Sequence, residues 1–244
     1  MGFFDIFTER GAGVVNDWQG TFLGNAAGAA NALLEVYGTK EASGSVGLAG
    51  DGMTTLSSLA TLFGGIGTDT SEAVIPDKNE RKAAKAVKWM DIGDGILGLL
   101  ASGGSMANNI GKLNGDDKVI NWGGIVKGGA GALRGLLTAG KALYKIFGKP
   151  GKDMSKAQKA EQWASTFSGA AGIVSGVAGA ASGIQGLMNK DNKTASQVSA
   201  WAAGAGALVD LFKAGIGTYA AGQKKPVEQM DSSPPTPNYT EGAN

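Results

Sequence analysis

The sequence predicts an all-helical protein made of three tandem helical hairpins, with six main helices whose packing faces are rich in Gly and Ala. Three observations support this fold class. The chain contains a three-fold internal repeat of about 75 residues. Each repeat has two arms that are too long for strands, and small residues recur three and four positions apart along the arms.

The repeat is found by comparing the chain with itself. The segment KAAKAVKW, which ends at Trp89, matches KAQKAEQW, which ends at Trp163. A more divergent copy begins at Trp18, where the pattern W-x-x-T-F-x-G is the same as that which begins at Trp163. In each copy a short polar joint separates the two arms, as is typical of antiparallel helix pairs. The joints are predicted near Lys40, Asp116 and Asp191.

The repeat divides the chain into hairpins at residues 1–68, 69–148 and 149–223, followed by a tail at 224–244. Charged segments that contain proline, at 70–81 and 148–156, are predicted to be solvent-facing links between the copies. The tail lacks periodicity and has the composition of disordered segments, so we expect it to be disordered.

Glycine is the residue that makes the arms unusual, since the chain has 42 of them. Residues spaced alternately three and four apart share one face of a helix. Small residues at this spacing let two helix backbones approach closely, which is how helices associate in membranes. The glycines predicted to serve in helix packing and membrane insertion are Gly169, Gly172, Gly176, Gly179, Gly183 and Gly186 in the third copy, Gly124, Gly128, Gly131 and Gly135 in the second, and Gly47 and Gly50 in the first.

Composition excludes most enzyme classes. The chain has no His and no Cys, so zinc sites with these ligands, Cys nucleophiles and Ser-His-Asp triads are absent. We expect no catalytic residues, no metal and no cofactor, and hence no enzyme. Lys plus Arg number 22 and Asp plus Glu 21, and this balance argues against nucleic acid as a partner.

The glycine faces alone suit two structures equally well: a glycine zipper in lipid, or a soluble bundle with tightly packed small faces. Charge placement favours the membrane. Residues Gln162–Asn189 contain no charged side chain, and this length is enough to span a bilayer. We therefore predict this arm to be the principal element of association and insertion. Its weak hydrophobicity is what we expect of a protein that is made soluble and inserts later.

On these features, residues Trp18 to Gly222 resemble the small glycine-zipper pore-forming effectors of bacterial type VI secretion systems. The resemblance implies an antibacterial toxin that is made in the cytoplasm, is secreted without a signal peptide and dissipates ion gradients across a target cell's inner membrane. It also implies contacts with membrane lipid, with a secretion-apparatus or chaperone protein and with an immunity protein, and it allows homo-oligomers. The N-terminal MGFFDIFTERG fits this route, because it has no basic segment and carries Asp5 in its apolar stretch.

Isolated acids in the apolar arms are candidates for the lining of a pore, where carboxylates favour cations. These are Asp51, Asp94 and Asp210; the alternative is the solvated face of a soluble helix. Three basic residues on one arm, Lys127, Arg134 and Lys141, would have to face water, a pore or a partner. The alternative function is that of a structural or ejection protein of a phage or contractile particle, which dye release from liposomes would distinguish from a toxin.

Overall fold

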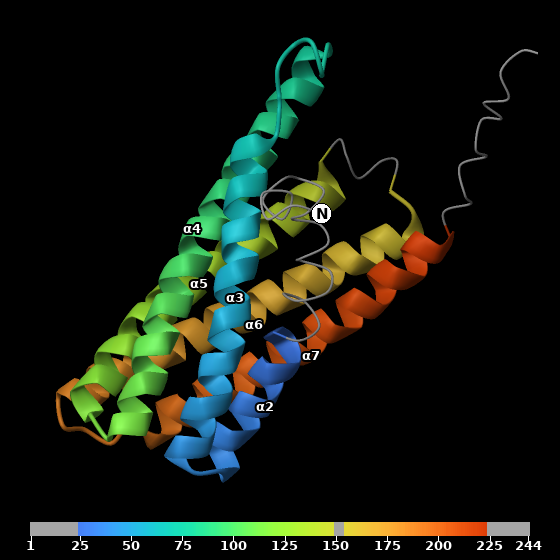
Figure 1. Ribbon diagram of the computed structural model, residues 1–244. Coiled ribbons are helices and arrows are strands. Elements are labelled where there is room, and N and C mark those ends of the chain that lie inside the picture. The colour runs from blue at the N-terminus through green and yellow to red at the C-terminus, as the bar shows by residue number, and fades with distance from the viewer. Residues whose placement is uncertain (1–23, 149–153, 224–244) are drawn as a thin grey trace, which may run out of the picture.

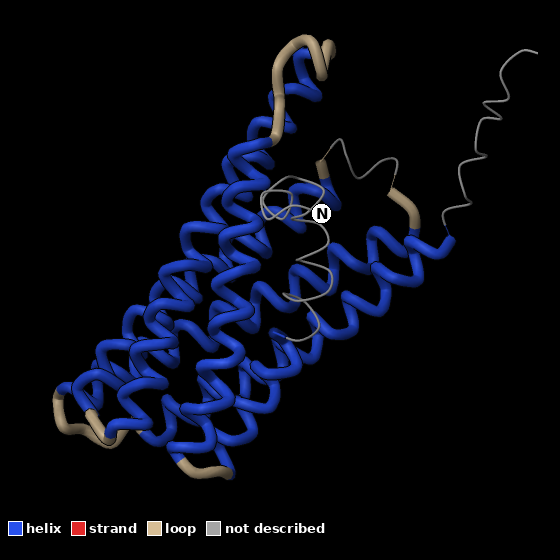
Figure 2. The backbone as a smooth tube through the Cα atoms, in the orientation of Figure 1, coloured by secondary structure: helices blue, strands red, loops and turns tan. Residues whose placement is uncertain are grey.

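The computed structural model describes residues 24–148 and 154–223, and the prediction of an all-α fold is confirmed there. These residues form six helices and no strand (Figures 1 and 2). The predicted disordered tail at 224–244 and the expected start of the first arm at Trp18 lie outside them. The helices are α2 (Gly24–Tyr37), α3 (Lys40–Gly67), α4 (Lys78–Asn114), α5 (Asp117–Phe147), α6 (Lys156–Leu187) and α7 (Lys193–Gln223).

The three joints inside the repeats are set by helix capping. Thr39 is the N-cap of α3, and its hydroxyl accepts a hydrogen bond from the backbone N–H of Ala42 at 3.2 Å. Gly115 ends α4 with a φ of 69°, a left-handed conformation that suits glycine. Asp116 then begins α5 by accepting the backbone N–H groups of Lys118 and Val119. The joint between α6 and α7 occupies residues 188–192.

The links between the repeats are shorter than the sequence indicates. Helix α4 begins at Lys78, inside the segment 70–81 that was expected to be a link. Its N-cap is Asp77, whose carboxylate accepts the backbone N–H groups of Asn79 and Glu80, and Glu80 in the first turn interacts favourably with the helix dipole. Helix α6 begins with a capping box in which Ser155 and Gln158 bond reciprocally.

The six helices form a closed ring. Each one packs on the helix before it and the helix after it in sequence, and α2 also packs on α7. Contacts therefore join α3 to α4 and α5 to α6, across the boundaries between repeats, as well as the two arms within each repeat. Helix α2 has 14 residues against 28 in α3, so within the described residues it covers part of its neighbours' length.

Side-chain size is distributed in the reverse of the usual order for a soluble protein, in which large apolar residues are buried. The buried apolar side chains among the described residues are all alanines: Ala32, Ala60, Ala130, Ala142 and Ala200. Most other buried positions hold Gly, Ser, Asn or Asp. Large apolar side chains are instead exposed on every helix, among them Leu33, Leu56, Phe63, Trp89, Leu100, Trp122, Leu133, Phe167, Val177, Trp201 and Phe212.

Ring closure can be tested by disulfide formation, because the chain has no cysteine of its own. A Cβ on Gly204 of α7 would lie 3.3 Å from the Cβ of Ala32 on α2, close to the separation of about 3.5–4.5 Å found in disulfides. We expect the variant carrying Ala32→Cys and Gly204→Cys to form this bond within one chain on mild oxidation, as measured by peptide mass spectrometry.

The control pairs Ala32→Cys with Gly103→Cys on α4. A Cβ at Gly103 would meet nothing within 4 Å, so this pair should not cross-link within a chain. Equal cross-linking of both pairs, or none in the first, would contradict the closed ring.

Candidate functional site

A cavity of about 800 Å³, partly open to solvent, lies between the helices of the ring; we call it the lumen, and residues of all six helices line it. Its wall is made of Gly, Ala, Ser, Thr, Asn and charged residues. Leu34 and Ile120 are the two large aliphatic side chains in it. A wall of this composition is polar enough to be hydrated, since its hydroxyl, amide and charged groups can bond to water.

Backbone contacts at glycine join α5 to α6. A Cβ on Gly135 would lie 2.6 Å from the carbonyl oxygen of Gly169, and one on Gly169 would lie 2.7 Å from the backbone nitrogen of Ala139. Gly128 and Gly176 face each other in the same way two helical turns away, where an added Cβ would meet backbone atoms of the opposite helix. Any larger residue at these four positions must push the helices apart.

The predicted glycine face therefore has two functions on α6. Gly169, Gly176 and Gly183 would each bring a Cβ against the backbone of α5. A Cβ on Gly172 or Gly179, which alternate with them, would come no closer than 3.5 Å to α5, and the glycines from Gly172 to Gly186 all line the lumen. The sixth glycine of the series, Gly186, lies against the side chain of Asn121.

The glycines predicted on the other copies divide similarly. On α5, Gly124 and Gly131 line the lumen, and a Cβ on Gly131 would meet nothing within 4 Å. On α3, Gly47 leaves the space that the side chain of Asn109 occupies. A Cβ on Gly50 would lie 3.2 Å from the Cβ of Ala27 on α2.

The packing face of α4 was not predicted from the sequence. A Cβ on Gly104 would meet the backbone of α5 at Lys127, and a Cβ on Gly95 would lie 2.7 Å from backbone atoms of Leu62 on α3. The sequence does contain a small-residue pattern along α4 if Ser and Asn are counted as small residues. The buried positions that recur at steps of three and four are Gly95, Gly98, Ser102, Ser105 and Asn109.

The three acids predicted to line a pore lie in different surroundings. Asp51 lines the lumen and accepts a hydrogen bond from Asn109 at 2.7 Å. Asp210 also lines the lumen and accepts a hydrogen bond from Ser168 at 2.8 Å. Asp94 is not part of the lumen wall; its two oxygens accept bonds from Arg134, at 2.8 and 3.3 Å.

Most charges of the lumen wall are paired. Glu35 on α2 and Lys112 on α4 form an ion pair at 2.6 Å, and Lys112 also donates to the hydroxyl of Ser43 at 3.2 Å. Lys40 and Asp117 pair at 3.4 Å in an exposed position, where such a pair stabilises little. Lys141, one of the three basic residues noted on α5, lies outside the lumen wall and pairs with Asp91.

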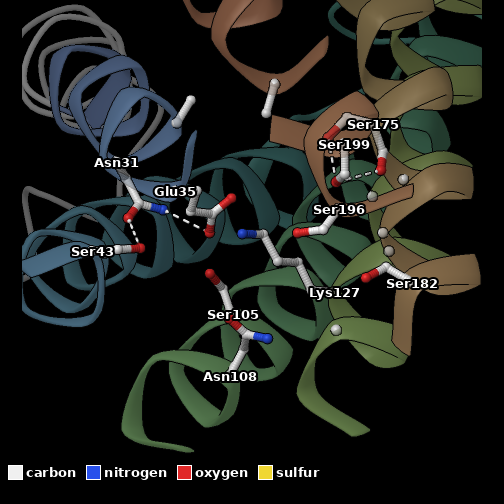
Figure 3. A pocket seen from close by; sticks show the side chains of 18 of the residues that line it. Asn31, Glu35, Ser43, Ser105, Asn108, Lys127, Ser175, Ser182, Ser196 and Ser199 are labelled. Atoms are coloured by element: carbon white, nitrogen blue, oxygen red, sulfur yellow. Dashed lines mark hydrogen bonds between the residues drawn. The ribbon is translucent and has the colours of Figure 1, made fainter. Parts of the chain in front are cut away.

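Lys127 differs from the other basic residues of the lumen wall. It has no ion pair within 4.0 Å in the part of the chain that the structure describes. Figure 3 shows its side chain extending into the lumen, with the amino group between Glu35 of α2 and Ser196 of α7. The electrostatic interactions of Lys127 are with Glu35, Asp51 and Lys112.

No group of three or more His, Cys, Asp or Glu residues that could hold a metal ion occurs among the described residues. Comparison of the chain with protein-family models, with curated proteins and with solved structures gave no match.

The two functions of the glycines can be separated by one substitution on each face of α5. Gly128→Ala and Gly131→Ala gain the same helix propensity, about 1 kcal/mol relative to glycine. At Gly131 the new methyl group enters open space, so we expect this variant to be as stable as the parent or more stable. At Gly128 it meets the backbone of α6, and overpacking of this kind destabilises by about 1–3 kcal/mol.

Urea unfolding in detergent micelles, followed by circular dichroism, measures the difference. The close-packing account is contradicted if Gly128→Ala is as stable as Gly131→Ala.

Proposed function

We propose that this protein permeabilises membranes by forming a pore, with the outer face of the helical ring in lipid and the lumen as the aqueous path. The observation that carries the proposal is the reversed distribution of side chains: small and polar inside, large and apolar outside. Exposed apolar surface of this extent marks contact with a membrane or with another protein.

The helices have the dimensions that the proposal needs. At 1.5 Å per residue, the 28 to 37 residues of α3 to α7 extend for about 42–55 Å, more than the roughly 30 Å of bilayer hydrocarbon. One described helix, α6, is also apolar enough to cross a membrane by composition. Only 17% of its apolar window is buried, whereas the core helix of a soluble protein is mostly buried, and this supports the proposal.

Close contact between glycines supports the same proposal. Lipid provides no hydrophobic force between helices, so their association in a bilayer depends on van der Waals contact and hydrogen bonds. The backbone contacts between α5 and α6 supply the first, and polar bonds across the ring, such as that between Ser168 and Asp210, supply the second.

The resemblance to type VI secretion effectors extends the proposal to delivery. The protein would be a toxin without catalytic activity that is secreted to a competing cell and acts at its inner membrane. Before insertion its apolar outer face needs cover, and a secretion-apparatus or chaperone protein would provide it. A cognate immunity protein would protect the producing cell.

The test is release of dyes of increasing size from lipid vesicles by the purified protein. We expect release of small dyes and retention of large dextrans, because a lumen of about 800 Å³ is too small for a dextran coil. If the folded protein leaves vesicles intact at neutral and acidic pH, its apolar outer face is a protein interface, as in a structural or ejection protein, and the pore proposal is wrong.

Matched variants connect leakage to the outer face of the ring. Val174 and Val177 on α6 are 50% and 59% exposed, so replacing both with Glu should leave the ring folded and abolish leakage, because carboxylates are costly in lipid. Thr194→Glu with Gln197→Glu adds the same charge at exposed polar positions of α7 and should leave leakage unchanged. Full leakage by the α6 variant would show that this face does not meet lipid.

A further inference from the structure

The lumen wall has one basic side chain whose charge is not used in an ion pair within the described residues, and this is Lys127. Of the other basic residues there, Lys40 pairs with Asp117, Lys112 with Glu35 and Arg134 with Asp94. An ion in the lumen therefore meets three cations whose donors are engaged, and one whose ammonium group is available.

The carboxylates of the lumen are less available to a passing cation. Asp51 accepts hydrogen bonds from Asn109 and Ser105, and Asp210 accepts one from Ser168. Glu35 accepts one from Lys112 at 2.6 Å. A cation that bound these oxygens would have to compete with donors that already hold them against the wall, whereas an anion would find Lys127 open.

The backbone around Lys127 is fixed from two sides. Gly104 of α4 lies against its backbone nitrogen, and the next residue, Gly128, lies against the backbone of α6. With α5 held between two neighbours, the remaining face of this turn points to the lumen, and Lys127 shares that face with Gly124, Gly131 and Arg134. Thus the contacts that close the ring also aim the lysine inward.

We propose that Lys127 is the anion-binding point of the lumen and makes the pore prefer small anions such as chloride over potassium. The hydroxyl groups of Ser182 and Ser196 line the same cavity as Lys127 (Figure 3). This inference rests on the proposed pore and reverses the cation preference that the acids predicted from the sequence would give.

The experiment measures the reversal potential of single pores in planar bilayers with unequal KCl on the two sides. The reversal potential of the unmodified protein should have the sign expected of a pore that prefers chloride. Lys127→Gln removes the ammonium and leaves the lumen wall with one more carboxylate than basic groups, so the sign should change to that set by potassium. Lys118→Gln removes a charge at an exposed position at the start of α5, outside the lumen wall, and should have no effect.

A second variant covers the case in which Lys127→Gln does not fold. In Lys127→Cys, the sole thiol of the chain can be labelled from solution after the pore has formed. A positively charged thiol reagent should restore the preference for chloride, and a negatively charged one should strengthen the preference for potassium. Labelling Lys118→Cys with either charged reagent should leave the ion preference of the pore unchanged.

The outcomes separate the two proposals. If the unmodified protein conducts no ions at all, the proposed pore is wrong and this inference is wrong with it. If the pores conduct but prefer potassium, or if changing the charge at position 127 leaves the reversal potential unaltered, the pore stands and Lys127 is not its selectivity residue.

Discussion

Contact between helix backbones at glycine is the interaction on which the remaining features of this ring depend. At Gly128, Gly135, Gly169 and Gly176 the facing helix occupies the space where a Cβ would be. Each interior glycine destabilises a helix by roughly 1 kcal/mol relative to alanine, and the close contact must offset that cost. Because small residues occupy both the contacts and the lumen, large side chains have only the outer face left to occupy.

The same constraint governs the polar groups inside the ring. Asn109 is fully buried, and its side chain fills the space that Gly47 leaves. Its amide nitrogen bonds to Asp51, while its side-chain oxygen has no partner within the described residues. Groups of this kind are costly in a dry core, since an unmade hydrogen bond costs about 1–3 kcal/mol. Asn109 does not line the lumen, so the close packing that Gly47 allows must offset this cost.

Most of the fold could be predicted from the sequence. The repeat and the spacing of small residues were sufficient for six helices, and the breaks at 38–39, 115–116 and 188–192 fall beside Lys40, Asp116 and Asp191. The early start of α4 was missed because the local charge pattern of residues 70–81 resembles a link, although Asp77 and Glu80 are also strong helix-start signals.

The site was harder to predict, because its features depend on which helices are neighbours. Spacing placed Gly172 and Gly176 on one face, and both line the lumen, but only the position of α5 shows that Gly176 also contacts the backbone of that helix. The charges behave likewise. Asp94 and Lys127 both interrupt apolar arms, yet Asp94 is paired with Arg134 across to the next helix, and Lys127 is not paired. Closure of the ring by α2 on α7 joins elements from the two ends of the chain, which no local pattern encodes.

The orientation of α6 in lipid is the most direct measure of whether the ring is apolar outside and aqueous inside. Single cysteines placed in turn along α6 can each carry a spin label. Collisions of the label with oxygen report that it lies in lipid, and collisions with a water-soluble nickel complex report that it lies in water. In vesicles, the oxygen signal should peak at Val174, Val177 and Ile184, and the nickel signal at Gly172, Ser175 and Gly179, so the two helical periodicities should be out of phase. Periodicities that are in phase, or oxygen maxima on the Ser175 side, would contradict the account.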